Sequence, residues 1–125
     1  MSVLILTDGS EKVVEMAGKI AKTLRGNILI REASAFAGTD LLPADVLFIG
    51  CCEPSPSSFG YIDELLHHIN LAGRKCGVFS PSSKKALQYL RGILKSTGIT
   101  IGSEPLTEAN SADIAKWTSG VLSGN

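Results

Sequence analysis

Short apolar runs and segments with helical spacing alternate along the chain. Five runs predict β-strands, because each holds apolar residues in a stretch of strand length bounded by polar residues or glycine. They are residues 2–7 (SVLILT), 27–32 (NILIRE), 44–51 (ADVLFIGC), 74–80 (RKCGVFS) and 99–104 (ITIGSE). The first and third runs are the most continuously apolar, which is typical of strands buried on both faces of a sheet. We therefore expect the third strand near the sheet centre.

Segments with apolar residues at helical spacing follow four of these strands. The positions expected to face inward are Val13, Ala17, Ile20, Leu24, Ile62, Leu65, Leu66, Ile69, Leu87, Leu90, Leu94, Ile114, Trp117 and Val121. We expect the first three helices to end at Gly26, Gly73 and Gly98, and the last to be capped by Asn110 or Ser111. The stretch 33–45 has room for a single helical turn.

Strand–helix alternation at this rhythm predicts parallel strands joined by right-handed crossovers, with helices on both faces. The fold class is therefore α/β, a three-layer α/β/α sandwich around a five-stranded parallel sheet. A chain of 125 residues suits one domain, expected over residues 1–125.

Ligands of such sheets bind outside the carboxyl ends of the strands, near the point where the strand order reverses. In this chain that rule selects the loops Thr7–Ser10, Cys51–Gly60 and Ser80–Lys84. The last two are rich in serine, proline and small residues, and packing alone does not explain them. We expect any binding site to lie at this edge.

The run from PADVLFIGC to SFGYIDELLHHINLAGRKCGVFS resembles the flavodoxin-like family. There, a third strand ends in a loop containing proline and an aromatic residue, before a helix and a strand similar to LAGRKCGVF. The later ALQYLRGILKSTGITI is similar to the family's penultimate helix and last strand. The resemblance covers nearly the whole chain and implies strand order 2-1-3-4-5, an FMN cofactor and electron transfer to a redox partner protein.

The resemblance also implies which residues would form the FMN site. Thr7, Gly9 and Ser10 match the hydroxyl and glycine positions of the phosphate loop, S/T-x-T-G-x-T in the family. The flavin ring would be framed by residues of the other two loops, namely Cys51, Cys52, Pro54, Ser57, Ser58, Phe59, Tyr61, Ser80, Ser82 and Ser83.

The first loop also supports an alternative function. It is shorter than the family pattern, so it offers fewer N–H donors to a phosphate, and it carries Asp8, whose charge would oppose a dianion. The 12 Lys and Arg residues balance the 12 Asp and Glu residues, whereas flavodoxins are typically acidic. The alternative is a flavin-free flavodoxin fold that acts as an interaction or regulatory module.

Local structure offers a second interpretation of four candidate residues. Ser10 or Asp8 could cap the helix that follows the first strand instead of binding phosphate. Phe59 or Tyr61 could pack beneath the helix that it begins instead of stacking on a flavin.

Composition and charge exclude several other functions. The balanced charge gives no electrostatic case for nucleic acid or an anionic membrane, and no apolar run approaches the ~20 residues of a membrane span. Because a strand is expected to begin at Ser2 or Val3, we expect no signal peptide and a cytoplasmic protein.

The cysteines and histidines show no metal-ligand spacing. Cys51 and Cys52 are adjacent at the carboxyl end of the third strand, where a reactive thiol would be well placed, but small buried cysteines are common and packing is the preferred interpretation. Cys76 lies roughly a strand length (~17–20 Å) away. His67 and His68 are neighbours and therefore point in different directions on a helix. The expected ion-pair partners of these histidines are Asp63 and Glu64 on the same helix.

Overall fold

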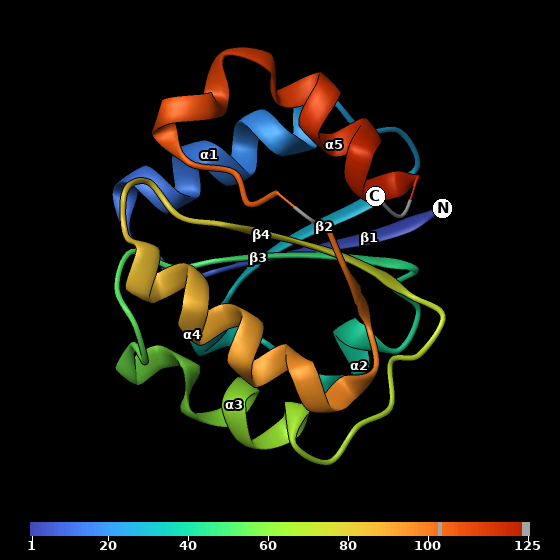
Figure 1. Ribbon diagram of the computed structural model, residues 1–125. Coiled ribbons are helices and arrows are strands. Elements are labelled where there is room, and N and C mark those ends of the chain that lie inside the picture. Colours follow the sequence, from blue (N-terminus) through green and yellow to red (C-terminus); the bar gives the residue numbers. More distant parts are fainter. Residues whose placement is uncertain (103, 124–125) are drawn as a thin grey trace.

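Five parallel strands form one sheet in the computed structural model, which describes residues 1–102 and 104–123. The strand order is β2-β1-β3-β4-β5 (Figure 1). The strands are β1 (Ser2–Thr7), β2 (Asn27–Glu32), β3 (Val46–Gly50), β4 (Lys75–Phe79) and β5 (Thr100–Ile101). The predicted fold class and strand order are confirmed, including the central position of β3.

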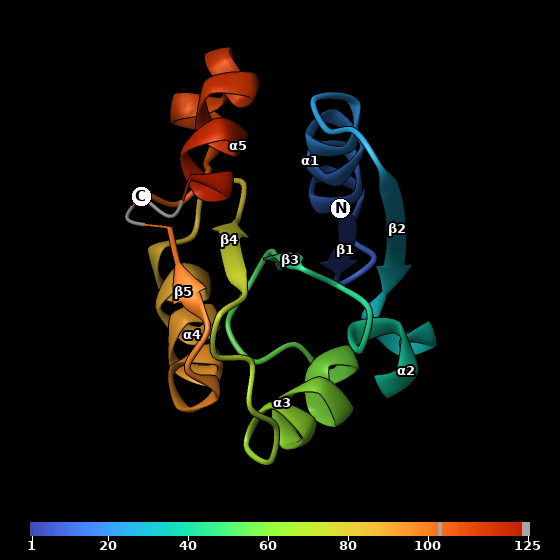
Figure 2. The same ribbon diagram turned by 90° about the vertical axis from the view of Figure 1, so that its right-hand side faces the viewer.

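Helices cover both faces of the sheet. Helices α1 (Glu11–Lys22) and α5 (Ile114–Leu122) lie on one face, and α2 (Gly38–Leu41), α3 (Gly60–Leu66) and α4 (Lys84–Leu94) on the other (Figures 1 and 2). The three layers are those expected from the sequence. Within the described residues, no helix is both long and apolar enough to cross a membrane.

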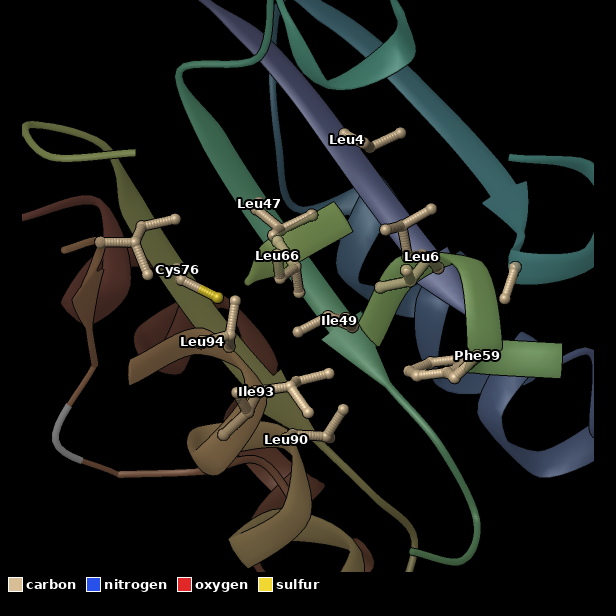
Figure 3. Close-up of a cluster of buried hydrophobic side chains, with 14 of the residues drawn as sticks. Leu4, Leu6, Leu47, Ile49, Phe59, Leu66, Cys76, Leu90, Ile93 and Leu94 are labelled. Atoms are coloured by element: carbon tan, nitrogen blue, oxygen red, sulfur yellow. The ribbon is translucent and has the colours of Figure 1, made fainter. Parts of the chain in front are cut away.

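Alternating strand residues build two hydrophobic clusters, one on each face of the sheet. Phe48 and Phe79 pack toward α1 and α5, whereas Ile49 and Val78 pack toward α3 and α4. Figure 3 shows part of the second cluster, in which Leu90 and other side chains of α4 approach the strands. Every residue of β3 is buried, which explains its uninterrupted apolar sequence.

The helix predicted to reach Gly73 is much shorter in the structure. Helix α3 ends at Leu66, and the following chain turns so that the Asn70 side chain accepts a hydrogen bond from the Ala72 N–H at 2.9 Å. The N–H of Leu71 bonds to the Thr97 carbonyl oxygen at 2.7 Å. Competition from these turn contacts explains why the helical spacing overestimates the helix.

The carboxyl-terminal elements also differ from their predicted limits. Strand β5 contains two residues. Among the described residues, pairing with β4 resumes at Leu106, which bridges Phe79. Residue 103 of the predicted strand lies outside the described residues.

The residue that caps α5 also differs from the prediction. The cap is Asp113, whose carboxylate accepts the Lys116 N–H at 3.0 Å. Asn110 instead accepts the Thr107 N–H at 2.7 Å in the preceding turn.

Candidate functional site

The loop between β1 and α1 is organised around the carboxylate of Asp8. One carboxylate oxygen, Oδ1, accepts the Ser10 N–H at 3.0 Å and the Ser10 hydroxyl at 2.6 Å. The other, Oδ2, accepts the Cys52 N–H at 2.8 Å. Asp8 therefore closes its own turn and ties it to the loop after β3.

Neither Ser10 nor Asp8 caps α1 in the predicted way, and the Asp8 carboxylate bonds to Ser10 and Cys52 instead. Ser10 occupies the N-cap position, yet its side chain makes no capping hydrogen bond, because its hydroxyl donates to Asp8. The Thr7 side chain is buried, and its oxygen accepts the Gly9 N–H at 3.2 Å. The turn uses its own acceptors to satisfy its donors.

A second carboxylate lies beside the same turn. Thr7, the last residue of β1, is the register partner of Glu32 at the end of β2. A methyl group in place of the Gly9 hydrogen would lie 3.4 Å from both the carboxyl carbon and one oxygen of Glu32. Gly9 itself has a φ of 83°, in the left-handed region that glycine adopts without strain.

The loop after β3 presents only part of its predicted ring-binding set to solvent. Cys52, Pro54 and Ser57 are exposed, Ser58 is half-buried, and Cys51 is buried. The Ser55 backbone adopts a φ of 48°, which is uncommon for a residue other than glycine.

The two aromatic residues of this loop lie in different environments. Phe59 is fully buried, and its ring centroid lies 6.3 Å from that of Tyr89 in α4. Its ring is therefore part of the core. Tyr61 is 51% exposed and packs against Phe36, in the segment after β2, with a centroid distance of 5.9 Å.

The loop after β4 holds its three serines in three different ways. Ser83 caps α4 by accepting the Ala86 N–H at 3.1 Å. Ser82 is exposed and, with Thr107 and Glu108, lines a cavity of about 550 Å³. Ser80 is fully buried, and its hydroxyl has no hydrogen-bond partner among the described residues.

Cys51 is buried beneath the loops in a setting that suppresses thiolate chemistry. Burial, with a smaller effect of the Asp8 charge, raises the pKa of Cys51 to about 12. Burial and the nearby Asp63 charge likewise raise the pKa of Tyr89 to about 12, and the Tyr89 hydroxyl donates to Asp63 at 3.5 Å. Thiolate attack from Cys51 is therefore disfavoured at neutral pH.

The first loop does not fit the phosphate that the family resemblance implies. The N–H groups of Gly9, Ser10 and Cys52 and the Ser10 hydroxyl already donate to acceptors of the protein. Two carboxylates, Asp8 and Glu32, lie at the turn. A phosphate dianion would have to displace the Asp8 carboxylate and remain close to Glu32, which electrostatic repulsion opposes.

Sequence reasoning identified Asp8 but missed both its bond to Cys52 and the neighbouring Glu32. The signal for Glu32 was available in the strand order, since a 2-1-3 arrangement brings the end of the second strand beside the first loop. The bond to Cys52 depends on loop conformation and leaves no pattern in the sequence. Among the described residues, no group of three or more His, Cys, Asp or Glu side chains could hold a metal ion.

Comparison with solved structures identifies the fold. A short-chain flavodoxin associated with a non-canonical PDU bacterial microcompartment is 16% identical, with a TM-score of 0.83 over 98% of this chain and 96% of that one. A Streptococcus pneumonia TIGR4 flavodoxin is 21% identical, with a TM-score of 0.78 over 99% of both chains. A Fusobacterium nucleatum flavodoxin bound to flavin mononucleotide is 13% identical, with a TM-score of 0.78 over 98% of this chain and 97% of that one.

Comparisons at the level of sequence give no relative. No family model matches the chain, and no curated protein matches it. The fold is therefore that of the flavodoxins, and the function has to be argued from the site.

Proposed function

We propose that this chain uses the flavodoxin fold as a protein-binding module that works without FMN. The observation that carries the proposal is the engagement of Asp8 with Ser10 and Cys52. In a phosphate-binding loop, N–H and hydroxyl donors point at the ligand. Here a carboxylate of the protein takes those donors and also joins the two loops that would enclose the ligand.

Electrostatics supports the same proposal. A unit charge on a carboxylate 4 Å from a unit charge on the phosphate costs about 1 kcal/mol in bulk water and about 4 kcal/mol at the effective dielectric of a protein surface. Asp8 and Glu32 would both contribute if phosphate entered the turn. The nearby Lys12 ammonium pairs with Glu108 at 3.3 Å, so its charge is partly neutralised.

The second candidate is the FMN-dependent electron carrier implied by the family resemblance. What favours it is the full-length structural likeness to flavodoxins, one of them bound to flavin mononucleotide. The residues that would hold the phosphate are Thr7, Gly9 and Ser10, and the flavin would supply one- and two-electron transfer to a redox partner protein. This candidate requires Asp8 to leave its present contacts.

The visible absorption spectrum of the purified chain, as isolated and after FMN is added, separates the two functions. We expect a colourless protein whose added FMN keeps the spectrum of the free cofactor. A flavodoxin treated in the same way provides the positive control. A yellow protein with one flavin per chain would overturn the proposal and establish the second candidate.

The state of the cysteines bears on where the protein works. Cys51, Cys52 and Cys76 are all free thiols, as is usual in a reducing compartment. We therefore propose a cytoplasmic location, as the sequence analysis expected.

A further inference from the structure

The two edges of the sheet differ in how they are protected from pairing with a further strand. Proteins commonly protect an edge with a very short strand, a proline, a lysine or a bulge. Strand β5, at one edge, contains two residues. Strand β2, at the other edge, contains six residues, none of them proline or lysine, and its register with β1 runs without a bulge. Its charged residues are confined to its last two positions.

Every second residue of β2 directs its backbone N–H and C=O groups away from the sheet. The Asn27 N–H donates to the Met1 carbonyl oxygen at 3.0 Å, so it faces β1. Because these groups alternate in direction along a strand, those of Ile28, Ile30 and Glu32 face outward. Within the described residues, β1 is the one strand that pairs with β2, which lies at the rim of the sheet (Figure 2). The outward groups form a row of donors and acceptors that another strand would satisfy.

The middle of β2 carries apolar side chains on both faces of the sheet. Ile28 packs partly against the cluster on the side of α1, and Leu29 packs partly against the cluster on the side of α3 and α4. Ile30, which alternates onto the face of Ile28, is 42% exposed. A hollow of about 370 Å³ opens beside Leu29, Pro43 and Ala44. The edge therefore offers apolar contacts as well as backbone hydrogen bonds.

The sequence of β2 is complementary to itself when two copies run antiparallel. A twofold axis at Leu29 places Leu29 opposite Leu29 of the second copy, and Ile28 opposite Ile30. The outward backbone groups of Ile28 and Ile30 then form hydrogen-bonded pairs, and apolar side chains meet apolar side chains, which stabilises cross-strand pairs. An axis at Ile30 would instead place Leu29 opposite Arg31 and Ile28 opposite Glu32.

The charges at the two ends of β2 favour the antiparallel direction. Arg25 is exposed just before the strand, and Glu32 is exposed at its end. Antiparallel pairing brings Arg25 of each copy near Glu32 of the other, whereas parallel pairing brings like charges together. Arg31 lies opposite Asn27 in this register and keeps Asp40 as its own partner at 3.8 Å. The chain carries no net charge, so long-range repulsion does not oppose association of two copies.

We propose that β2 pairs antiparallel with β2 of a second copy of this chain, so that the two five-stranded sheets become one continuous sheet. The interface is isologous and closes at the dimer, because a twofold axis uses the same edge of both copies. The inference goes beyond the proposed function and does not depend on it. A chain that binds FMN would pair through β2 in the same way.

Sedimentation velocity of the full 125-residue chain at concentrations from about 1 µM to about 1 mM measures the monomer–dimer equilibrium. We expect dimers to accumulate as the concentration rises. Amide hydrogen exchange followed by NMR at both ends of this range locates the contact. The outward N–H groups of Ile28 and Ile30 should exchange at least about threefold more slowly in the concentrated sample. The N–H of Leu29, which already faces β1, should change less.

A charge on the outer strand tests the site of pairing. Ile30→Lys places an ammonium group opposite Ile28 of the second copy, and we expect it to weaken dimerisation by roughly tenfold or more. The matched control is Thr100→Lys, at an exposed position of β5, which should leave the dimer unchanged. Trp117 fluorescence checks that each variant keeps its fold.

Charge reversal tests the direction of pairing without altering the apolar positions. We expect Arg25→Glu to weaken dimerisation by roughly threefold to tenfold, because it places a carboxylate near Glu32 of the second copy. The double variant Arg25→Glu/Glu32→Arg should regain most of the lost affinity, since opposite charges again face one another.

Several outcomes would overturn the inference. These are a chain that stays monomeric over the whole range, a dimer in which exchange at Ile28 and Ile30 is unchanged, and equal weakening by Thr100→Lys and Ile30→Lys. Failure of the double variant to regain affinity would exclude the antiparallel pairing. The visible spectrum with FMN is recorded on the same samples, so failure of the flavin-free proposal is recognised independently of the association result.

Discussion

Asp8 has contacts that are unusual for a residue in a short strand-to-helix turn. Its carboxylate bonds to Ser10 within the turn and to Cys52 across the sheet edge. Hydrogen bonds to a charged acceptor are stronger than those between neutral groups. At the scale of the residue, Asp8 acts as an internal anion in the place where the family resemblance expects a bound phosphate.

Replacement of Asp8 by alanine tests this role. We expect Asp8→Ala to lower the free energy of unfolding by about 1–3 kcal/mol, because three donors of the two loops lose their acceptor. Urea denaturation followed by Trp117 fluorescence measures the change. Glu15→Ala, at an exposed position of α1, is the control and should change stability by no more than about 0.5 kcal/mol. Equal stability of Asp8→Ala and the wild type would show that the carboxylate does not hold the loops.

Buried thiols predict a loss of stability at alkaline pH. Burial raises the pKa of Cys51 from 9.0 to about 12 and raises that of Cys76 as well. The unfolded chain therefore releases these protons at lower pH than the folded chain. The resulting stabilisation is fully present below pH 9, and it is lost as the pH rises through the range from 9 toward 12.

Urea denaturation at a series of pH values measures this loss. We expect the free energy of unfolding to fall steadily above about pH 9. The free energy of unfolding of the double variant Cys51→Ala/Cys76→Ala should fall less steeply with pH, because two of the groups that lose a proton on unfolding are gone. Tyr89 remains, and its pKa is also raised to about 12. A wild-type curve that is flat or rises over this range would contradict the burial of the thiols.

At the scale of the element, glycine allows close packing between β4 and the aromatic side chains on one face of the sheet. A methyl group at Gly77 would lie 2.8 Å from the Trp117 ring and 2.9 Å from the Phe48 ring, whose centroids are 5.5 Å apart. The absence of a side chain at Gly77 thus fixes how closely α5 approaches the sheet.

Gly77→Ala should therefore destabilise the protein by about 1–3 kcal/mol through overpacking, and it should change the Trp117 emission spectrum. The matched control is Gly92→Ala in α4, where a methyl group would meet no atom within 4 Å. Because alanine favours helix, that control should raise stability by about 0.5–1 kcal/mol. A Gly77→Ala variant as stable as the control variant would refute the packing argument.

The elements were predictable from sequence to the extent that local pattern determines them. Strands β1 to β4 follow from apolar runs, and the strand order followed from the family resemblance. The end of α3 was missed because Asn70 and Leu71 bond to turn and tertiary partners. The Asp113 cap was missed because several polar residues before α5 could each have capped it.

At the scale of the whole molecule, the sequence predicted the sheet edge at which a ligand would bind. It did not predict the contacts that the loops at that edge make with one another. The decisive contacts join residues distant in sequence, Asp8 with Cys52 and Gly9 with Glu32. Both depend on strand register and loop conformation.

The carboxyl edge of the sheet is held in part by contacts of the protein with itself. Asp8 ties the loop after β1 to the loop after β3. In the loop after β4, Ser82 lines a cavity of about 550 Å³. The contacts of Asp8 are thus confined to the first two loops, and the proposed FMN-free function rests on them.

Calorimetric titration of the wild-type chain with FMN and, separately, with riboflavin tests the central claim most directly. The two ligands differ only in the phosphate, so the ratio of their dissociation constants reports what the first loop contributes. We expect FMN to bind no more tightly than riboflavin, because Asp8 and Glu32 oppose the phosphate. Binding of FMN with a dissociation constant below ~1 µM, about −8 kcal/mol, and at least tenfold tighter than that of riboflavin would contradict it.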